Sequence, residues 1–171
     1  MKIPLASYFK SPFKKKKTPS HQSGLPDEIS WDDTKPYIPP VSWGRVIKVY
    51  DGDTITIATY VHNLPDLYRF SVRLKGIDCP EIRSKISAEK SVATLAKQYL
   101  EERILGKDIE LRNVSLEKYG RILAEVWYDG TSMNSSLLDD RLAVVYNGGK
   151  KCVPENWLDY HMKDHMNDGR L

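Results

Sequence analysis

The feature that most constrains the fold is a series of three apolar-alternating runs joined by short turns. The runs span residues 41–49, 54–60 and 67–74, and β-branched residues dominate the second run. Asp51-Gly52 lies between the first two runs, and Asp-Gly is a strong hairpin signal because glycine can adopt a positive φ. The three runs therefore predict an antiparallel meander.

The second half of the chain changes period. Residues 87–105 repeat apolar side chains at three- and four-residue steps, with Ser87 as a candidate N-cap and Gly106 just past the end. Two further strands, a short helix, an extended segment and a last helix are predicted at 108–114, 121–128, 132–140, 142–146 and 154–166. Together with the meander they predict a mainly β, α+β fold, namely a five-stranded Greek-key barrel of the OB type with about three packed α-helices.

The first 40 residues predict a separate, disordered arm, followed by a folded domain at 41–171. The arm contains seven of the ten prolines and the run Lys14–Lys17, so it buries too little apolar surface to offset its ordering entropy. The lysine run suits a nuclear-import signal, a phosphate-binding patch or a plain solubilising tail. Leu5, Tyr8 and Phe9 resemble the sliding-clamp-binding peptide of replication proteins, although Lys2 stands where that motif has glutamine.

Composition excludes several classes of protein. No run approaches the roughly 20 apolar residues that cross a bilayer, and the N-terminus has no apolar signal-peptide core. Cys79 and Cys152 are too few for a disulfide framework. We therefore expect an intracellular monomer with no membrane partner.

The charge of the chain is unevenly distributed. Residues 1–45 carry eight Lys or Arg against four Asp or Glu, whereas residues 46–171 carry 18 Lys or Arg against 19 Asp or Glu. Any phosphate bound by the folded part must be met by a few placed arginines.

A cluster of charges follows the third predicted strand. Arg73, Asp78 and Glu81 lie within nine residues, at a point where Pro80 prevents the strand from continuing. A guanidinium suits a phosphate, and two carboxylates suit a hard divalent cation. The cluster therefore predicts metal-assisted attack on a phosphodiester. The alternative interpretation is a strand end with solvated charges. Further support comes from two other segments, Asp51–Thr54 and Tyr119–Arg121.

These segments together resemble the staphylococcal nuclease family. The matching pieces are Asp51-Gly52-Asp53-Thr54, Arg73 through Glu81, Lys118-Tyr119-Gly120-Arg121, Asn134–Leu138 and Arg141–Ala143. The resemblance covers roughly residues 43–150. It implies a calcium-dependent nuclease that hydrolyses the P–O5′ bond of DNA or RNA, preferably single-stranded, and leaves 3′-phosphates.

The resemblance also implies roles for individual residues. Asp53 and Asp78 would bind Ca²⁺ together with the backbone carbonyl of Cys79, where the family has threonine, and Asp51 would support the metal from nearby. Glu81 would be the general base. Arg73 and Arg121 would bind the phosphate, and Tyr119 would lie near the nucleotide. Further candidates for stacking and phosphate contacts are Tyr146, Lys150 and Lys151. For the last three, a core tyrosine with surface lysines is the alternative.

Two other functions remain open from the sequence. A nuclease-like OB module that has lost activity would bind nucleic acid or protein, but such modules lose the arginines and acids that persist here at Arg73, Asp53, Asp78, Glu81 and Arg121. A clamp-recruited replication or repair accessory is compatible with the enzyme. The segment after Glu81 is several residues shorter than in the secreted bacterial enzyme, which predicts a different substrate preference.

Overall fold

The computed structural model describes residues 25, 26 and 28–163, which fall in two units divided after Lys35. The first unit contains one short 3-10 helix, η1 (Trp31–Asp33). Its first turn is capped by Asp33, whose Oδ2 accepts hydrogen bonds from the backbone N–H and the hydroxyl of Ser30. Residues 28–38 are all exposed. The clamp-like motif at Leu5, Tyr8 and Phe9 and the run Lys14–Lys17 lie outside the described residues.

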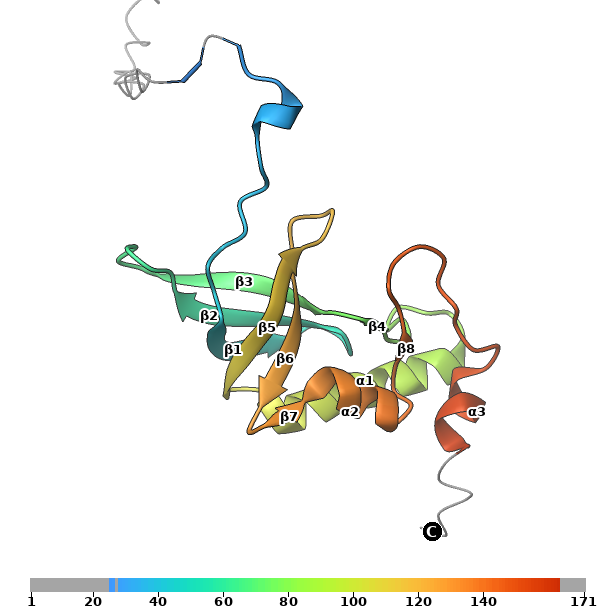
Figure 1. Ribbon diagram of the computed structural model, residues 1–171. Coiled ribbons are helices and arrows are strands. Elements are labelled where there is room, and N and C mark those ends of the chain that lie inside the picture. The colour runs from blue at the N-terminus through green and yellow to red at the C-terminus, as the bar shows by residue number, and fades with distance from the viewer. Residues whose placement is uncertain (1–24, 27, 164–171) are drawn as a thin grey trace, which may run out of the picture. The chain divides into compact units, whose positions relative to one another are not determined.

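A closed β-barrel forms the centre of the second unit (Figure 1). Antiparallel pairing links the strands in the order β3-β2-β1-β5-β6, and a parallel pairing of β3 with β6 closes the circle. This arrangement confirms the predicted five-stranded OB-type barrel. The strands are β1 (Trp43–Val49), β2 (Thr54–Tyr60), β3 (Leu67–Leu74), β5 (Asp108–Leu116) and β6 (Ile122–Tyr128).

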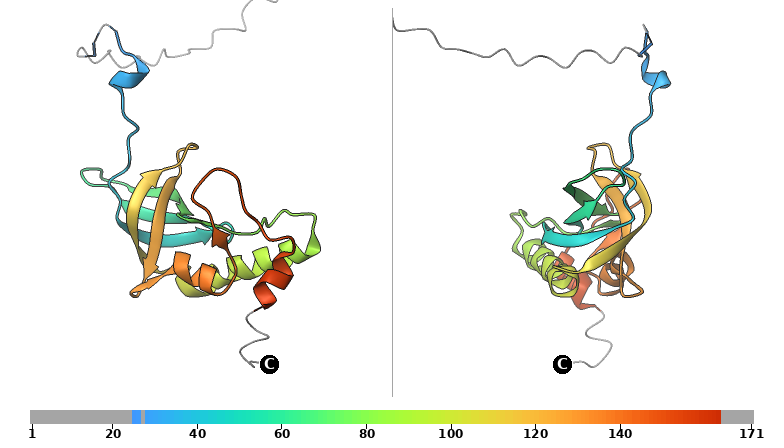
Figure 2. Two further views of the ribbon diagram at one scale, coloured as in Figure 1. Left: turned by 45° about the vertical axis from the view of Figure 1, so that its right-hand side comes forward. Right: turned by 90° about the vertical axis from the view of Figure 1, so that its left-hand side faces the viewer.

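The described chain has three α-helices, as predicted, namely α1 (Ser87–Ile104), α2 (Met133–Asp139) and α3 (Trp157–Met162). The helices α1 and α2 pack on the barrel, and α3 packs on α1. Figure 2 shows α1 and α2 at the same end of the barrel. Ser87 is the first helical residue rather than the N-cap, which is Ile86. In the described part of the chain, no helix is long and apolar enough to cross a membrane.

Of three two-residue strands, β4 (Ile77–Asp78) and β7 (Thr131–Ser132) were not predicted from the sequence, whereas β8 (Val144–Val145) lies within the extended segment predicted at 142–146. The strand β4 pairs with β8, and β7 pairs with the end of β6. Two residues are too few to show a hydrophobic period, so only tertiary pairing defines such strands. The β4–β8 pair matters because it fixes the backbone of Asp78.

The β1–β2 turn contains Gly52 as predicted, but the predicted reason, a positive φ, is wrong. Gly52 is not among the glycines with positive φ. Instead it is needed for space, because a Cβ at this position would lie 2.7 Å from the Cβ of Ala96 and 2.9 Å from the Sγ of Cys79. Gly52 thus lets the β1–β2 turn approach α1 and the segment after β4.

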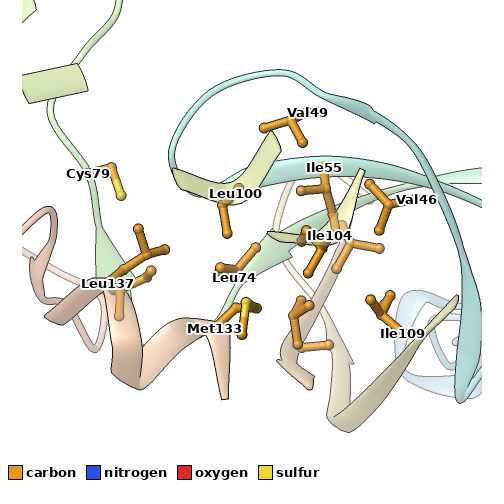
Figure 3. Close-up of a cluster of buried hydrophobic side chains, with 14 of the residues drawn as sticks. Val46, Val49, Ile55, Leu74, Cys79, Leu100, Ile104, Ile109, Met133 and Leu137 are labelled. Carbon is orange, nitrogen blue, oxygen red and sulfur yellow. The ribbon is translucent and has the colours of Figure 1, made fainter. Parts of the chain in front are cut away.

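The core joins the barrel interior to the helices (Figure 3). Leu74 at the end of β3, Leu100 and Ile104 on α1, and Leu137 on α2 are completely buried. Burying each such side chain contributes about 1.5–3 kcal/mol. Since Leu74 directly follows Arg73, this packing also fixes the end of β3, where the predicted site begins.

Candidate active site

A buried ion-pair triad lies at the end of the barrel strands. The guanidinium of Arg73 donates from Nη1 to Oδ1 of Asp53, at 2.7 Å, and from Nη2 to Oδ1 of Asp78, at 2.8 Å. Asp53 and Asp78 are buried, and the Arg73 side chain is 15% exposed. Removing one partner from such a group leaves an uncompensated buried charge, so the three residues form one interdependent unit.

Backbone pairing explains why residues so far apart in sequence meet. In the β2–β3 register Thr54 lies opposite Arg73, which places Asp53 beside the end of β3. The N–H of Leu74 donates to the carbonyl of Asp53 at 2.8 Å, and the N–H of Cys79 donates to Oδ2 of Asp53 at 3.2 Å. The triad is therefore positioned by backbone pairing at the ends of the strands.

The Asp53 carboxyl group has a perturbed acidity. Burial raises its pKa to about 6, and the positive charge of Arg73 opposes this effect. Nearby Asp51 raises the pKa further by charge repulsion, while it also accepts a hydrogen bond from the N–H of Asp53 at 3.2 Å. Perturbed carboxylates of this kind are typical of functional sites.

Glu81 lies beside the triad on an exposed segment. Its side chain is 69% exposed, and its backbone N–H donates to Oε1 of Glu89 at 3.1 Å. The second oxygen of Glu89 accepts from the hydroxyl of Ser84. Glu89, at the start of α1, thus holds the short segment that carries Glu81, and sequence reasoning missed this role.

The turn between β5 and β6 brings the second predicted arginine into the site. Nε of Arg121 donates to Oε1 of Glu117, and this hydrogen bond lowers the pKa of the Glu117 carboxyl group. Glu117 was not singled out from the sequence, because an acid four residues before an arginine indicates an ion pair on a helix but not in a turn. Tyr119 is 72% exposed, with the ammonium of Lys118 at 4.8 Å from its ring centre.

One pocket of about 370 Å³ unites most of the predicted residues. The predicted site residues that line it are Asp51, Asp53, Arg73, Cys79, Glu81, Tyr119, Arg121, Tyr146 and Lys151. Lys150 does not line the pocket, and no hydrogen bond or ion pair joins its side chain to another described residue. The structure therefore brings together every predicted residue of the folded domain except Lys150. Asp78 does not line the pocket itself but binds Arg73, which does.

A second cavity of about 440 Å³ adjoins this pocket. Arg73, Glu117, Lys118 and Tyr146 line both spaces. Tyr146 is fixed there because its N–H donates to the carbonyl of Gly76 at 2.9 Å and its hydroxyl donates to the carbonyl of Gly149 at 3.3 Å.

The metal ligands predicted from the sequence form a sparse set. Among residues 25, 26 and 28–163, no three His, Cys, Asp or Glu side chains are grouped to hold a metal ion. The predicted set needs only two such side chains, Asp53 and Asp78, with the carbonyl of Cys79. These are hard oxygen donors suited to calcium or magnesium. Oδ2 of Asp78 accepts no hydrogen bond within the described residues, so the donor chemistry fits a divalent cation.

The Cys79 side chain is buried in the core cluster that also contains Leu100 and Leu137 (Figure 3). Burial, reinforced by the charges of Asp53 and Asp51, raises the pKa of its thiol well above the usual value. A protonated, buried thiol is inert, so replacing a threonine here leaves only the backbone carbonyl as a candidate ligand.

Comparison with known proteins agrees with this architecture. The model of the staphylococcal nuclease homologue family matches residues 71–160, a stretch that includes Arg73, Asp78, Glu81 and Arg121 but not Asp53. Since the match covers more than half of the chain, this protein belongs to the staphylococcal nuclease homologue family.

Several curated relatives carry endonuclease names. The chain is 35% identical over 91 residues to "Probable endonuclease LCL3" of Saccharomyces cerevisiae, which covers 50% of this chain and 32% of that protein. It is 31% identical over 102 residues to an "Uncharacterized endonuclease" of Haemophilus influenzae, covering 60% and 51%. It is 26% identical over 142 residues to the LCL3 protein of Komagataella phaffii, covering 70% and 62%. The chain thus spans about a third to three-fifths of these relatives, and their names support a nuclease.

Proposed function

We propose that this protein is a calcium-dependent nuclease that hydrolyses phosphodiester bonds of single-stranded DNA or RNA. One observation supports this most strongly. A single pocket combines a buried, arginine-bridged carboxylate pair with an exposed glutamate and a second arginine. A solvated strand end would not bury two carboxylates, because removing charged groups from water costs free energy that pairing with Arg73 offsets only in part.

Asp53, Asp78 and the carbonyl of Cys79 would hold the cation, with Asp51 supporting Asp53 from the turn. A bound calcium ion supplies positive charge that polarises the phosphate and lowers the pKa of water. Arg73, held from both sides, is preorganised to neutralise charge on the phosphate as the transition state forms. Each preorganised donor of this kind typically contributes about 3–4 kcal/mol to catalysis.

Glu81 would position and deprotonate the attacking water. Its carboxylate is solvent-exposed at the pocket, and its backbone is fixed by Glu89, so the group is accessible while its segment is anchored. Arg121 is paired with Glu117 in the absence of substrate. A phosphate entering the pocket would compete with Glu117 for this guanidinium, which forms two parallel hydrogen bonds with phosphate oxygens.

The shape of the site favours unpaired strands. Tyr119 is exposed beside the pocket, and Tyr146 lines both cavities. Bases can reach these aromatic rings only when they are unstacked from a duplex, and stacking on a ring contributes about 1–3 kcal/mol per base. The proposed products carry 3′-phosphates, from cleavage of the P–O5′ bond. Recruitment by a sliding clamp and nuclear import remain predictions from the arm sequence.

The direct test uses end-labelled single-stranded DNA with purified protein in calcium and in a chelator. We expect calcium-dependent cleavage by the wild type and a loss of about 100-fold or more in Glu81→Gln. The matched control is Glu102→Gln, because Glu102 is an exposed glutamate on α1 outside both pockets. If the protein binds DNA but does not cleave it in any divalent metal, the proposed nuclease activity is wrong and the protein is an inactive nucleic-acid-binding module.

A further inference from the structure

A lysine from the C-terminal part of the domain enters the carboxylate site. The ammonium of Lys151 lies 3.0 Å from Oδ1 of Asp78 and 3.4 Å from Oε1 of Glu81. Lys151 belongs to the loop between β8 and α3, which rises beside β4 in Figure 1. Gly148 and Gly149 both have positive φ, so the chain can turn sharply between β8 and the lysine.

Lys151 is the second cation on the same oxygen. Oδ1 of Asp78 already accepts from Nη2 of Arg73 at 2.8 Å. The charges of Asp53 and Asp78 are therefore balanced by two cations that belong to the chain itself. Although partial burial opposes it, the hydrogen bond to Asp78 raises the pKa of Lys151, which keeps the ammonium charged.

The two cations differ in how firmly they are held. Arg73 bridges two buried carboxylates from within a strand and is 15% exposed. Lys151 contacts the site from a loop and is 45% exposed. A divalent cation bound to these carboxylates would be repelled at short range by both positive charges. Of the two side chains, Lys151 can move into solvent, because a loop carries it and not a strand.

We propose that Lys151 competes with a divalent cation for the Asp78 carboxylate. The inference rests on the metal site of the proposed function. In the metal-free protein Lys151 compensates the buried charge of Asp78, and metal binding displaces it toward Glu81 and the open side of the pocket. The affinity for calcium is accordingly weaker than the carboxylates alone would give, and Lys151 sets the calcium concentration at which the site is filled.

Calcium binding measured by titration calorimetry, without nucleic acid, tests the competition. We expect Lys151→Gln to bind calcium about tenfold more tightly than the wild type, because one nearby positive charge is removed. Lys151→Arg keeps the charge and should stay within about threefold of the wild type. Lys150→Gln makes the same change of net charge one residue away, where the side chain has no partner in the described chain, and should leave the affinity unchanged.

Thermal unfolding gives a second readout that also reveals a misfolded variant. In a chelator, Lys151→Gln should melt below the wild type, because Asp78 loses a counter-ion. In excess calcium the difference should disappear or reverse. An unchanged or weaker calcium affinity in Lys151→Gln would overturn the competition, as would a tightening of equal size in Lys150→Gln.

The outcome is separable from that of the proposed function. Calcium-dependent cleavage by the wild type, together with an unchanged affinity in Lys151→Gln, would overturn the competition and leave the nuclease intact. Tighter binding in Lys151→Gln, together with no cleavage by the wild type, would support the competition and overturn the nuclease. A wild type and a Lys151→Gln variant that both bind no calcium would overturn the competition whatever the cleavage result.

Discussion

The pocket has two sides of opposite character. On the barrel side, Arg73 and Asp78 lie on paired strands and Asp53 directly precedes one, and both nearly buried carboxylates bind Arg73. On the loop side, Glu81 and Tyr119 are 69% and 72% exposed and are carried by turns. The barrel side is held together by its own ion pairs, whereas the loop side presents exposed side chains to a ligand.

The difference indicates a division of labour. Preorganised charges are most effective where a cation and a phosphate must be held in fixed positions. Groups that meet water and bases need access instead, and loops give access at little cost in stability. Substitutions on the barrel side should therefore change both stability and activity, whereas those on the loop side should change activity alone.

The largest effect should come from Arg73→Gln. This variant leaves Asp53 and Asp78 buried beside each other without their shared cation, so we expect the free energy of unfolding to fall by about 3–5 kcal/mol in a chelator. Cleavage should fall at least about 1,000-fold, because the phosphate contact is also lost. Urea denaturation and single-turnover assays measure the two effects. A stability within 1 kcal/mol of the wild type would contradict the described barrel side.

Arg121→Gln should separate activity from stability. Arg121 is about one-third exposed and pairs with the partly buried Glu117 outside the triad. Ion pairs that water can reach contribute at most about 1 kcal/mol. We expect cleavage to fall about 100- to 1,000-fold with nearly unchanged unfolding. The control is Arg103→Gln, which removes an exposed arginine on α1 that does not line the pocket. Equal losses of activity in both variants would show that general charge, not Arg121, matters.

The raised pKa of Asp53 predicts a pH dependence of stability. Because the folded-state pKa is about 6 and the ordinary value is 3.8, the native state binds the proton more tightly. The stabilisation from this proton is complete below about pH 3.8 and is lost as pH rises through about 6.

The variant Asp53→Asn keeps a neutral side chain at every pH. Relative to the wild type it should therefore gain on the order of 2–3 kcal/mol between about pH 4 and pH 7.5 in a chelator. Unfolding curves at several pH values measure this difference. Excess calcium should remove the gain, because the wild-type carboxylate then has a cation. A difference that does not vary with pH would mean that Asp53 is ionised without cost in the folded protein.

The smallest effect should come from the exposed ring of Tyr119. We expect Tyr119→Ala to raise KM for single-stranded DNA about tenfold, because one stacking contact is lost, while kcat and unfolding change little. Tyr119→Phe keeps the ring and should behave like the wild type. A fall in kcat with unchanged KM would assign Tyr119 to the chemical step rather than to substrate binding.

The same contrast between strands and loops explains how much was predictable from the sequence. The barrel strands and α1 follow from local periodicity, and Arg73 and Asp78 follow from the charge cluster at and just after the end of β3. The two-residue pairing of β4 with β8 has no periodic signal, because it depends on segments almost 70 residues apart. The steric need for Gly52 depends likewise on Ala96 and Cys79, which only the folded chain brings near.

Loop contacts were the least predictable part of the site. The sequence suggested Lys150 and Lys151 alike as phosphate contacts, yet only Lys151 reaches the pocket. Glu117 and Glu89 were missed because each acts through a partner, Arg121 or the backbone of Glu81, and charged residues near turns are usually just solvated. Such roles depend on side-chain placement after folding, which no local pattern encodes.

The most direct measurement follows cleavage and melting of the wild type across one calcium titration. If the buried carboxylates that hold the barrel side together also hold the metal, the melting temperature and the cleavage rate should begin to rise over the same range of free calcium. Calcium-dependent cleavage with a melting temperature that calcium does not change would place the metal elsewhere and contradict the described site. If calcium raises the melting temperature but the protein cleaves nothing, the protein binds calcium at this site and the proposed nuclease activity is wrong.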